Sequence, residues 1–137
     1  MNKQIYITDF DMKRFKWLSS NSHKFDDMYK KHVYDLEMEL KNAVIVEPKD
    51  IPSDVVTMNS KFRIKDLETN EETVYTLVFP FDADLEQNKL SILAPIGVAV
   101  IGYKLGDIIE WDVPAGKRRI KIEEILYQPE REGNYYI

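Results

Sequence analysis

The sequence predicts an α+β protein in which a helical hairpin is followed by an antiparallel sheet around one short helix. Up to about residue 46, apolar residues recur at helical spacing. The segment 47–55 then holds two prolines and three acidic residues, which is typical of a linker. Beyond it, short runs rich in β-branched and aromatic residues alternate with turn-forming residues, as the strands of an antiparallel sheet do.

The first helix is expected to run from Asp9 to Ser19. Thr8 is suited to cap it, and Asp11, three positions on, takes the place of the partner in a capping box. The apolar residues of this helix gather toward one side and predict its buried face: Phe10, Phe15, Trp17 and Leu18.

A second helix is expected from about Asp26 to Val46, after the polar turn SSNSHK at residues 19–24. Its apolar residues are spaced by about 3.5, and the adjacent Asp26 and Asp27 suit the positive N-terminal end of a helix. Two helices joined by a short turn predict an antiparallel hairpin, a short coiled coil. We therefore divide the chain into the hairpin, residues 1–47, and a second domain, residues 48–137.

The second domain contains six strand-like runs: VVTM at 55–58, KFRIKDL at 61–67, TVYTLVF at 73–79, LSIL at 90–93, DIIEWDV at 107–113 and RRIKIEEILY at 118–127. The stretch APIGVAVIGYKLGD at 94–107 interrupts them and predicts a short buried helix that begins at Pro95. Gly97 is small enough to let this helix lie close on the sheet, and Gly102 permits a positive backbone torsion at its end. The C-terminus, residues 127–137, fits either a closing strand or part of an interface.

Composition excludes several kinds of chemistry. The 137 residues include no cysteine, so thiolate metal sites and cysteine nucleophiles are impossible and a reducing cytoplasm is the expected compartment. No apolar run has the length of a signal peptide or a membrane span. The net charge of −5 falls entirely on residues 51–137, because residues 1–50 carry nine basic and nine acidic side chains. Sequence-specific nucleic-acid binding is therefore not expected.

The run IPSDVVTMNSKFRIKDL at 51–67, the run LSILAPIGVAVIGYKLGDIIEWDVPAG at 90–116 and YQPE at 127–130 resemble the Rnk family. This family, whose name stands for regulator of nucleoside diphosphate kinase, comprises short relatives of the GreA/GreB transcription elongation factors. The spaced string SxLxPxGxAxxGxxxGDxxxxxxPxG is also similar to the C-terminal domain of the Gre factors. The resemblance implies an FKBP-like fold for the second domain and RNA polymerase as the partner. It also implies docking near the secondary channel of the polymerase through Leu93, Ala94, Pro95 and Ile96.

Transcript cleavage of the Gre type is the first alternative function. Gre factors carry a D-x-x-E motif at the tip of a long hairpin, whereas here Lys30 stands three positions after Asp27 and Tyr29 three after Asp26. A helix of about 11 residues reaches only roughly 17 Å. We therefore expect the hairpin to occupy space and compete with Gre factors without stimulating cleavage. The expected tip contacts are Asn21, His23, Lys24, Asp26 and Asp27.

Prolyl isomerisation is the second alternative, because it is the activity of FKBP domains. Those enzymes place an aromatic residue at the head of the short helix, where this chain has Ile96, Gly97 and Val98, and a shared fold does not transfer an activity. The sequence also has no P-loop, no nucleophile beside a base and no metal-ligand cluster. We expect a monomeric, non-enzymatic regulator that binds RNA polymerase, without catalytic residues, metal or cofactor and without a membrane partner.

Overall fold

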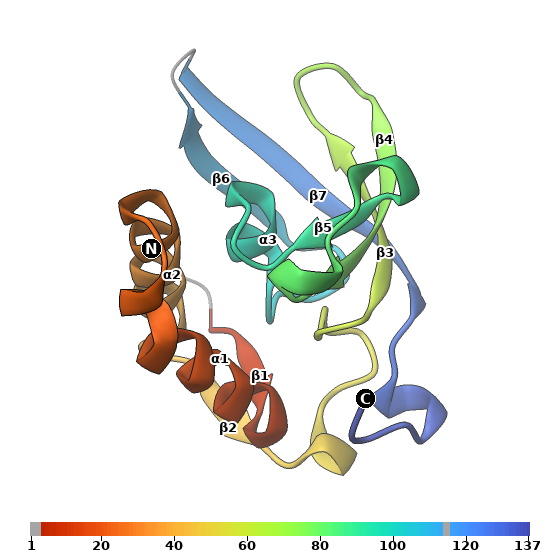
Figure 1. The fold of residues 1–137 in the computed structure, drawn as a ribbon. Coiled ribbons are helices and arrows are strands. Elements are labelled where there is room, and N and C mark those ends of the chain that lie inside the picture. Colours follow the sequence, from red (N-terminus) through yellow and green to blue (C-terminus); the bar gives the residue numbers. More distant parts are fainter. Residues whose placement is uncertain (1–3, 114–115) are drawn as a thin grey trace.

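The computed structural model describes residues 4–113 and 116–137, with the backbone alone for 111–113. Its helices are α1 (Asp9–Asn21), α2 (Asp27–Leu40) and α3 (Pro95–Val100), and its short 3-10 turns are η1 (Ser22–Lys24), η2 (Pro48–Asp50), η3 (Pro80–Asp82), η4 (Leu85–Gln87) and η5 (Glu130–Glu132). Its strands are β1 (Tyr6–Thr8), β2 (Val44–Val46), β3 (Lys61–Asp66), β4 (Glu72–Val78), β5 (Lys89–Ser91), β6 (Ile108–Val113) and β7 (Gly116–Tyr127). The helical hairpin lies beside a mixed domain of sheet and helix (Figure 1).

The main sheet has five strands in the order β5-β4-β3-β7-β6. All its neighbours pair antiparallel except β4 and β5, which run parallel. The expectation of a purely antiparallel sheet is therefore wrong at one edge. The chain passes through η3 and η4 before β5 begins, and this detour lets it return in the same direction as β4. The helix α3 packs between β6 and α2 (Figure 1).

The start of α1 follows the sequence prediction. Thr8 is extended, and its Oγ1 accepts a hydrogen bond from the main-chain N–H of Asp11 at 3.0 Å. The Asp11 side chain does not complete a capping box, because it is buried and turned toward Arg14 and Met58. Trp17 was expected on the buried face but is 52% exposed. The face that packs inward consists of Asp11, Phe15 and Leu18, which follow helical spacing.

The helix α2 ends at Leu40, six residues earlier than expected, and residues 44–46 form strand β2. This strand pairs parallel with β1, with Tyr6 opposite Val44 and Thr8 opposite Val46. The run Val-Ile-Val favours a strand because its side chains are β-branched. The sequence alone did not reveal this strand, because its pairing partner is distant along the chain: Tyr6 and Val44 are 38 positions apart.

The strand β1 joins the hairpin to the domain at Gly102. The main-chain N–H of Tyr6 donates to the carbonyl of Gly102 at 3.2 Å, and Gly102 donates to Val56 at 2.9 Å. Gly102 has φ of 81°, and a Cβ there would lie 2.8 Å from the Cβ of Ile5.

Residues 55–58 form no strand beyond one bridge between Val55 and Lys104, so the strand expected there is wrong.

The helix α3 lies against the sheet at Gly97, as the sequence predicts. A Cβ on Gly97 would stand 2.2 Å from the carbonyl oxygen of Ser91 at the end of β5. Only glycine allows this approach without displacing the backbone. Gly97 therefore sets the distance between α3 and β5.

The hairpin and the sheet share one hydrophobic core. Buried residues of both parts belong to a single cluster, including Phe15, Leu18, Val33 and Leu36 from the helices and Phe62, Leu77, Ile122, Val100 and Ile101 from the domain. A separate arm held only by a linker would not bury its apolar side chains in this way. The hairpin therefore packs on the domain through one face of α1 and α2, while the tip around η1 stays exposed.

The two ends of the second domain meet in space. The buried Gln128 donates through Nε2 to the carbonyls of Pro52 and Val55, each at 2.8 Å. Thr57 donates through Oγ1 to Glu130 at 2.7 Å. The C-terminus after β7 forms η5 and a tail instead of a closing strand. The stretch PAG at 114–116 is typical of a turn, but residues 114 and 115 lie outside the described part of the chain.

Candidate docking surface and hairpin tip

The segment Leu93–Ile96 forms a lip at the start of α3. The N–H of Leu93 donates to Oγ of Ser91 at 3.0 Å, and Ala94 accepts from Val98 at 2.9 Å as the helix begins. Leu93 is 5% exposed and belongs to the core, whereas Pro95 is exposed and Ala94 and Ile96 are half-buried. The surface that a partner can reach at this lip is therefore Ala94, Pro95 and Ile96.

A groove of about 530 Å³ lies beside the lip, on the face of the sheet that α3 partly covers. Its lining combines buried apolar side chains with a polar rim: Ile64, Leu90, Ile120, Tyr75, Leu85, Thr73, Asp66, Glu71, Arg118 and the three lip residues. Concave surfaces with an apolar floor and few polar groups are the usual form of a binding site.

Sequence reasoning did not identify the groove residues of the sheet. Ile64 stands opposite Thr73 in β4 and Ile122 in β7, so the groove floor forms only when three strands pair. The alternation of side chains along each strand indicates which residues share a face. It does not indicate which strands are neighbours, and this is why Tyr75 and Arg118 were missed.

The polar rim of the groove holds an ion pair between Arg118 and Asp66. Asp66 also accepts hydrogen bonds through Oδ1 from the N–H groups of Glu68, at 2.8 Å, and Thr69, at 3.2 Å. These bonds fix the carboxylate at the turn after β3. The groove therefore has a charged rim next to an apolar floor.

The five tip residues predicted from the sequence lie together around η1. Asn21, the last residue of α1, donates through Nδ2 to the carbonyl of Trp17 at 2.8 Å, and His23 and Lys24 are exposed in η1. Asp26 caps α2, because its Oδ1 accepts from the N–H of Tyr29 at 2.8 Å.

Asp27 follows in the first turn of α2 and is fully exposed, 3.9 Å from the ammonium of Lys30. An exposed pair of this length contributes little to stability. The tip acids therefore have local roles at the start of a helix. Within the described part of the chain, no group of three or more potential metal ligands occurs.

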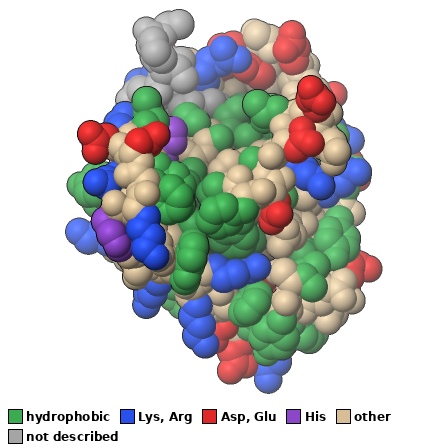
Figure 2. Space-filling view, in the orientation of Figure 1, with side chains coloured by type: hydrophobic (Ala, Val, Ile, Leu, Met, Phe, Trp, Pro, Cys, Tyr) green, Lys and Arg blue, Asp and Glu red, His purple; other side chains and the backbone are tan. Residues whose placement is uncertain are grey.

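An exposed aromatic pair also went unpredicted. Trp17 of α1 and Phe81 of η3 meet edge to face at 6.0 Å, and they are 52% and 65% exposed. Together with Arg14, Leu18 and Phe79 they line a hollow of about 220 Å³ between the hairpin and the sheet. Apolar side chains reach the surface in several patches on the face drawn in Figure 2, among charges of both signs.

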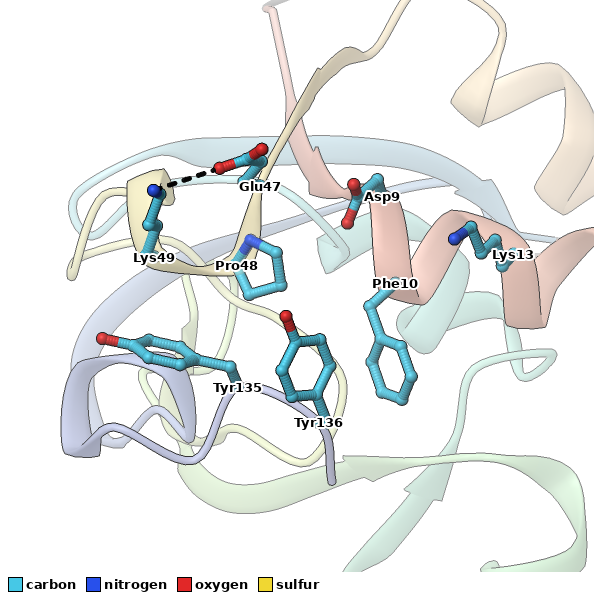
Figure 3. Close-up of a pocket in the computed structure, with 8 residues that line it drawn as sticks. All are labelled: Asp9, Phe10, Lys13, Glu47, Pro48, Lys49, Tyr135 and Tyr136. Atoms are coloured by element: carbon cyan, nitrogen blue, oxygen red, sulfur yellow. Dashed lines mark ion pairs between the residues drawn. The ribbon is translucent and has the colours of Figure 1, made fainter.

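A further hollow of about 290 Å³ lies where α1 begins (Figure 3). The rings of Phe10, Tyr135 and Tyr136 line one side of it, and the carboxylates of Asp9 and Glu47 lie on the other. Phe10 and Tyr136 pack edge to face at 5.3 Å, so the C-terminal tail contacts the first turn of the hairpin.

Three titratable groups near the junction of hairpin and domain have shifted pKa values. Burial raises the pKa of Asp11, although Arg14 and the N–H of Met58 oppose the shift. Burial also raises the pKa of Glu130. Burial and the neighbouring carboxylate of Glu39 raise the pKa of Tyr103 to about 12. Carboxyl groups with raised pKa values are candidates for functional sites, but here they occur at a packing junction.

The fold and surfaces define a protein with a helical hairpin, a five-stranded sheet and a lip beside a groove. A family model described as transcription elongation factor, GreA/GreB, C-term matches residues 51–127. The chain belongs to the GreA/GreB family. The resemblance predicted from the motif string is thereby confirmed.

Among curated relatives, the chain is similar to the regulator of nucleoside diphosphate kinase of Escherichia coli (strain K12), with 39% identity over 103 residues. This match covers 74% of the chain and 76% of the relative. Transcription elongation factor GreA of Acetivibrio thermocellus is 44% identical over 93 residues, which are 68% of the chain and 58% of that protein. These relatives are named as a regulator and an elongation factor.

Among solved structures, the chain is similar to a prokaryotic transcription elongation factor GreA/GreB from Nitrosomonas europaea. The TM-score is 0.71 and the sequences are 39% identical, with 92% of this chain and 100% of that chain covered. The arrangement of hairpin and sheet is therefore a GreA/GreB-like structure. Within the residues that the structure describes, none of the helices has the length and apolar character needed to cross a membrane.

Proposed function

We propose that this protein is a regulator of transcription that docks on RNA polymerase near the secondary channel, through the lip Ala94–Ile96 and the groove beside it. The observation that carries the proposal is the position of the exposed Pro95 at the edge of an apolar groove of about 530 Å³ in a member of the GreA/GreB family. The buried Leu93 would support the lip from below. An apolar anchor surrounded by a polar rim is a common form of protein interface.

The hairpin would occupy space beside the docked domain and compete with Gre factors without stimulating cleavage. Three features support this role. The hairpin packs into the common core, its helices span only 13 and 14 residues, and Asp26 is engaged in capping α2. The exposed His23, Lys24 and Asp27 would make the polar contacts at the tip.

Two alternative functions follow from the family and the fold. A cleavage factor would need the tip acids to hold a metal ion at the polymerase active site. A prolyl isomerase would need the groove to hold a proline peptide, and Tyr75 is an aromatic side chain in that groove. We favour the docking regulator because the tip lacks D-x-x-E and the head of α3 carries Ile96 and Gly97.

Several further expectations accompany this proposal. The chain would act as two units, residues 1–47 and 48–137, of which the second is FKBP-like because a curved sheet holds one short helix. It would work as a monomer in the cytoplasm, without enzymatic activity. An effect on nucleoside diphosphate kinase would arise through transcription.

Docking is tested by measuring the affinity of the purified protein for core RNA polymerase. Ile96→Asp places a charge in the groove, and we expect it to weaken binding by at least about tenfold. Ile45→Asp is the matched control, because Ile45 is 46% exposed on β2, away from the lip. Equal affinities for both variants and the unchanged protein would rule out the lip as the docking site.

Cleavage is tested on a backtracked transcription complex. The protein alone should leave the transcript intact and should reduce the cleavage that a Gre factor stimulates. Cleavage by the protein alone that disappears in the Asp26→Asn, Asp27→Asn double variant would instead identify a cleavage factor. A rate above background in a proline-peptide assay would identify an isomerase.

A further inference from the structure

The helix α1 contacts the base of the β3–β4 hairpin at two points. Asp11 accepts a hydrogen bond through Oδ2 from the N–H of Met58 at 3.2 Å, and the guanidinium of Arg14 lies 4.6 Å from the ring centre of Phe79. Met58 comes shortly before β3 and Phe79 directly after β4. The N–H of Asn59 donates to Leu77 at 2.6 Å, so both contact points lie at the same end of this strand pair.

The two points are coupled by the ion pair between Arg14 and Asp11. Asp11 is only 2% exposed, and Arg14 also lies over the ring of Phe10, 4.3 Å from its centre. Breaking a buried pair by removing one partner leaves an uncompensated charge, which is strongly unfavourable. A guanidinium between two aromatic rings gains further attraction from their π faces.

The electrostatics of the surroundings agree with this geometry. Glu130 accepts a hydrogen bond from Thr57 nearby, and the charge of Asp11 adds to the burial that raises the pKa of Glu130. Asp11 therefore lies in a place where a carboxylate is tolerated only with Arg14 and the Met58 N–H in position. The hydrogen bond from Met58 depends on the hairpin staying docked on the sheet domain, whereas Arg14 belongs to the same helix as Asp11.

We infer that Asp11, Arg14, Met58 and Phe79 form a latch that fixes the pose of the helical hairpin on the sheet domain. Asp11 is the positioning residue, because it binds both the arginine of its own helix and the main chain of the domain. Arg14 adds a second contact with the domain, because its guanidinium lies over the ring of Phe79. Other contacts of α1 with the domain are apolar, such as Phe15 against Phe79, and apolar contacts specify direction less sharply than a hydrogen bond.

The latch determines where the hairpin tip stands relative to the lip. A partner that contacts both the tip at His23 and the lip at Pro95 would meet them at a fixed separation. This consequence rests on the proposed function, whereas the latch itself is a property of the free protein. The two ideas are therefore tested separately.

The test measures the pose of the hairpin in the free protein. Because the chain has no cysteine, Lys24→Cys at the tip and Lys61→Cys on β3 accept two spin labels without other substitutions. The distance distribution between the labels should have one narrow peak. In Asp11→Ala this peak should broaden or shift, while the strand amides of β3 and β7 keep their protection from hydrogen exchange.

Two further variants separate positioning from general loss of stability. Asp11→Asn keeps an oxygen that accepts from Met58 and should restore the narrow peak. Asp35→Ala removes an exposed aspartate of the same hairpin and should leave the distribution unchanged. A narrow, unshifted peak in Asp11→Ala would overturn the latch, and so would broadening of equal size in Asp35→Ala.

The unmodified protein provides a test that needs no variant. The N–H of Met58 should exchange as slowly as the strand amides of β3, because its acceptor is the side chain of a docked helix. Fast exchange at Met58 beside slow exchange in β3 would overturn the latch even if Asp11→Ala does not fold. Loss of polymerase binding with an intact narrow peak would count against the proposed function alone.

Discussion

Asp11 of α1 accepts a hydrogen bond from the main-chain N–H of Met58 across 47 positions of sequence, at 3.2 Å. Only one turn of helix separates this contact from the cap of α1, where Thr8 accepts from Asp11. The first turn of the hairpin is therefore both the start of a helix and the joint with the sheet domain. The stability of this joint can be examined through its charges, its caps and its close backbone contacts.

Replacing Asp11 by Asn should change how stability depends on pH. The pKa of Asp11 is raised above 3.8 in the folded protein, so the folded state binds its proton more readily than the unfolded chain. The free energy of unfolding contributed by this group is therefore full below about pH 3.8 and declines as the pH rises through the folded pKa. The difference in the free energy of unfolding between Asp11→Asn and the unchanged protein should therefore move in favour of Asp11→Asn as the pH rises from acid to neutral, measured by urea unfolding at a series of pH values. A difference that is constant with pH would contradict the prediction.

Tyr103 should make the protein sensitive to alkali. Its hydroxyl donates to Glu39 of α2 at 3.1 Å, and its pKa is raised from 10.0 to about 12. Above pH 10 the unfolded chain releases this proton while the folded protein holds it, so the free energy of unfolding falls as the pH rises from 10 to 12. Tyr103→Phe should lower stability by about 1 kcal/mol at neutral pH and lessen the decline at high pH. Denaturant unfolding at pH 8 and pH 10.5 checks both the loss of stability and its pH dependence. An equally steep decline of the free energy of unfolding in Tyr103→Phe would contradict the prediction.

Gly97→Ala should destabilise the contact between α3 and β5. The added Cβ would stand 2.2 Å from the carbonyl oxygen of Ser91, a backbone atom that cannot move without displacing the strand. We expect a loss of about 1–3 kcal/mol in the free energy of unfolding. Gly106→Ala is the control, because Gly106 has open space around it and a positive φ of 89°, so that only backbone strain is added. A loss in Gly97→Ala no larger than in the control would contradict the close-contact reading of α3.

The cap of α2 predicts different effects for two changes at Asp26. Asp26→Ala removes the acceptor for the N–H of Tyr29 and should lower the free energy of unfolding by about 1 kcal/mol. Asp26→Asn keeps an acceptor of similar capping strength and should be nearly neutral. Thermal unfolding of both variants checks the pair. Equal losses would show that capping is not the role of this side chain, and a neutral Asp26→Asn makes that variant suitable for the cleavage assay.

Local sequence signals predicted the helix starts and most strands correctly, because the groups involved are near one another in the chain. Thr8 and Asp26 cap their helices through residues three positions on. The periods of the strands β3, β4, β6 and β7 were visible because alternation is a property of a single strand. The close contact of Gly97 with the sheet was also predicted from a local signal, because a small residue within a short apolar helix indicates close packing.

The errors arose where a distant segment decided the local structure. Residues 44–46 continue the helical spacing of α2, yet they pair with β1. The apolar Val55–Met58 looks like a strand but donates and accepts outside the sheet, with Gly102 and Tyr103 among its partners. The parallel direction of β5 relative to β4 depends on the intervening η3 and η4, which are short turns with weak sequence signals. In each case the observed structure depends on contacts with residues far away in the sequence, and the pattern within one segment carries no information about those contacts.

By itself the sequence determined the family, the helical hairpin, the strands β3 to β7 in their order, and the short helix that begins at Pro95, since these follow from motifs and from periods along one segment. Only the tertiary structure decided that Asp11 is buried against Met58, that Trp17 is exposed beside Phe81, and that a groove lies next to the lip. The physical reason is that burial and hydrogen bonding between distant residues depend on which elements become neighbours. A polar residue such as Asp11 gives no sign in the sequence that a main-chain N–H 47 positions away will be its partner.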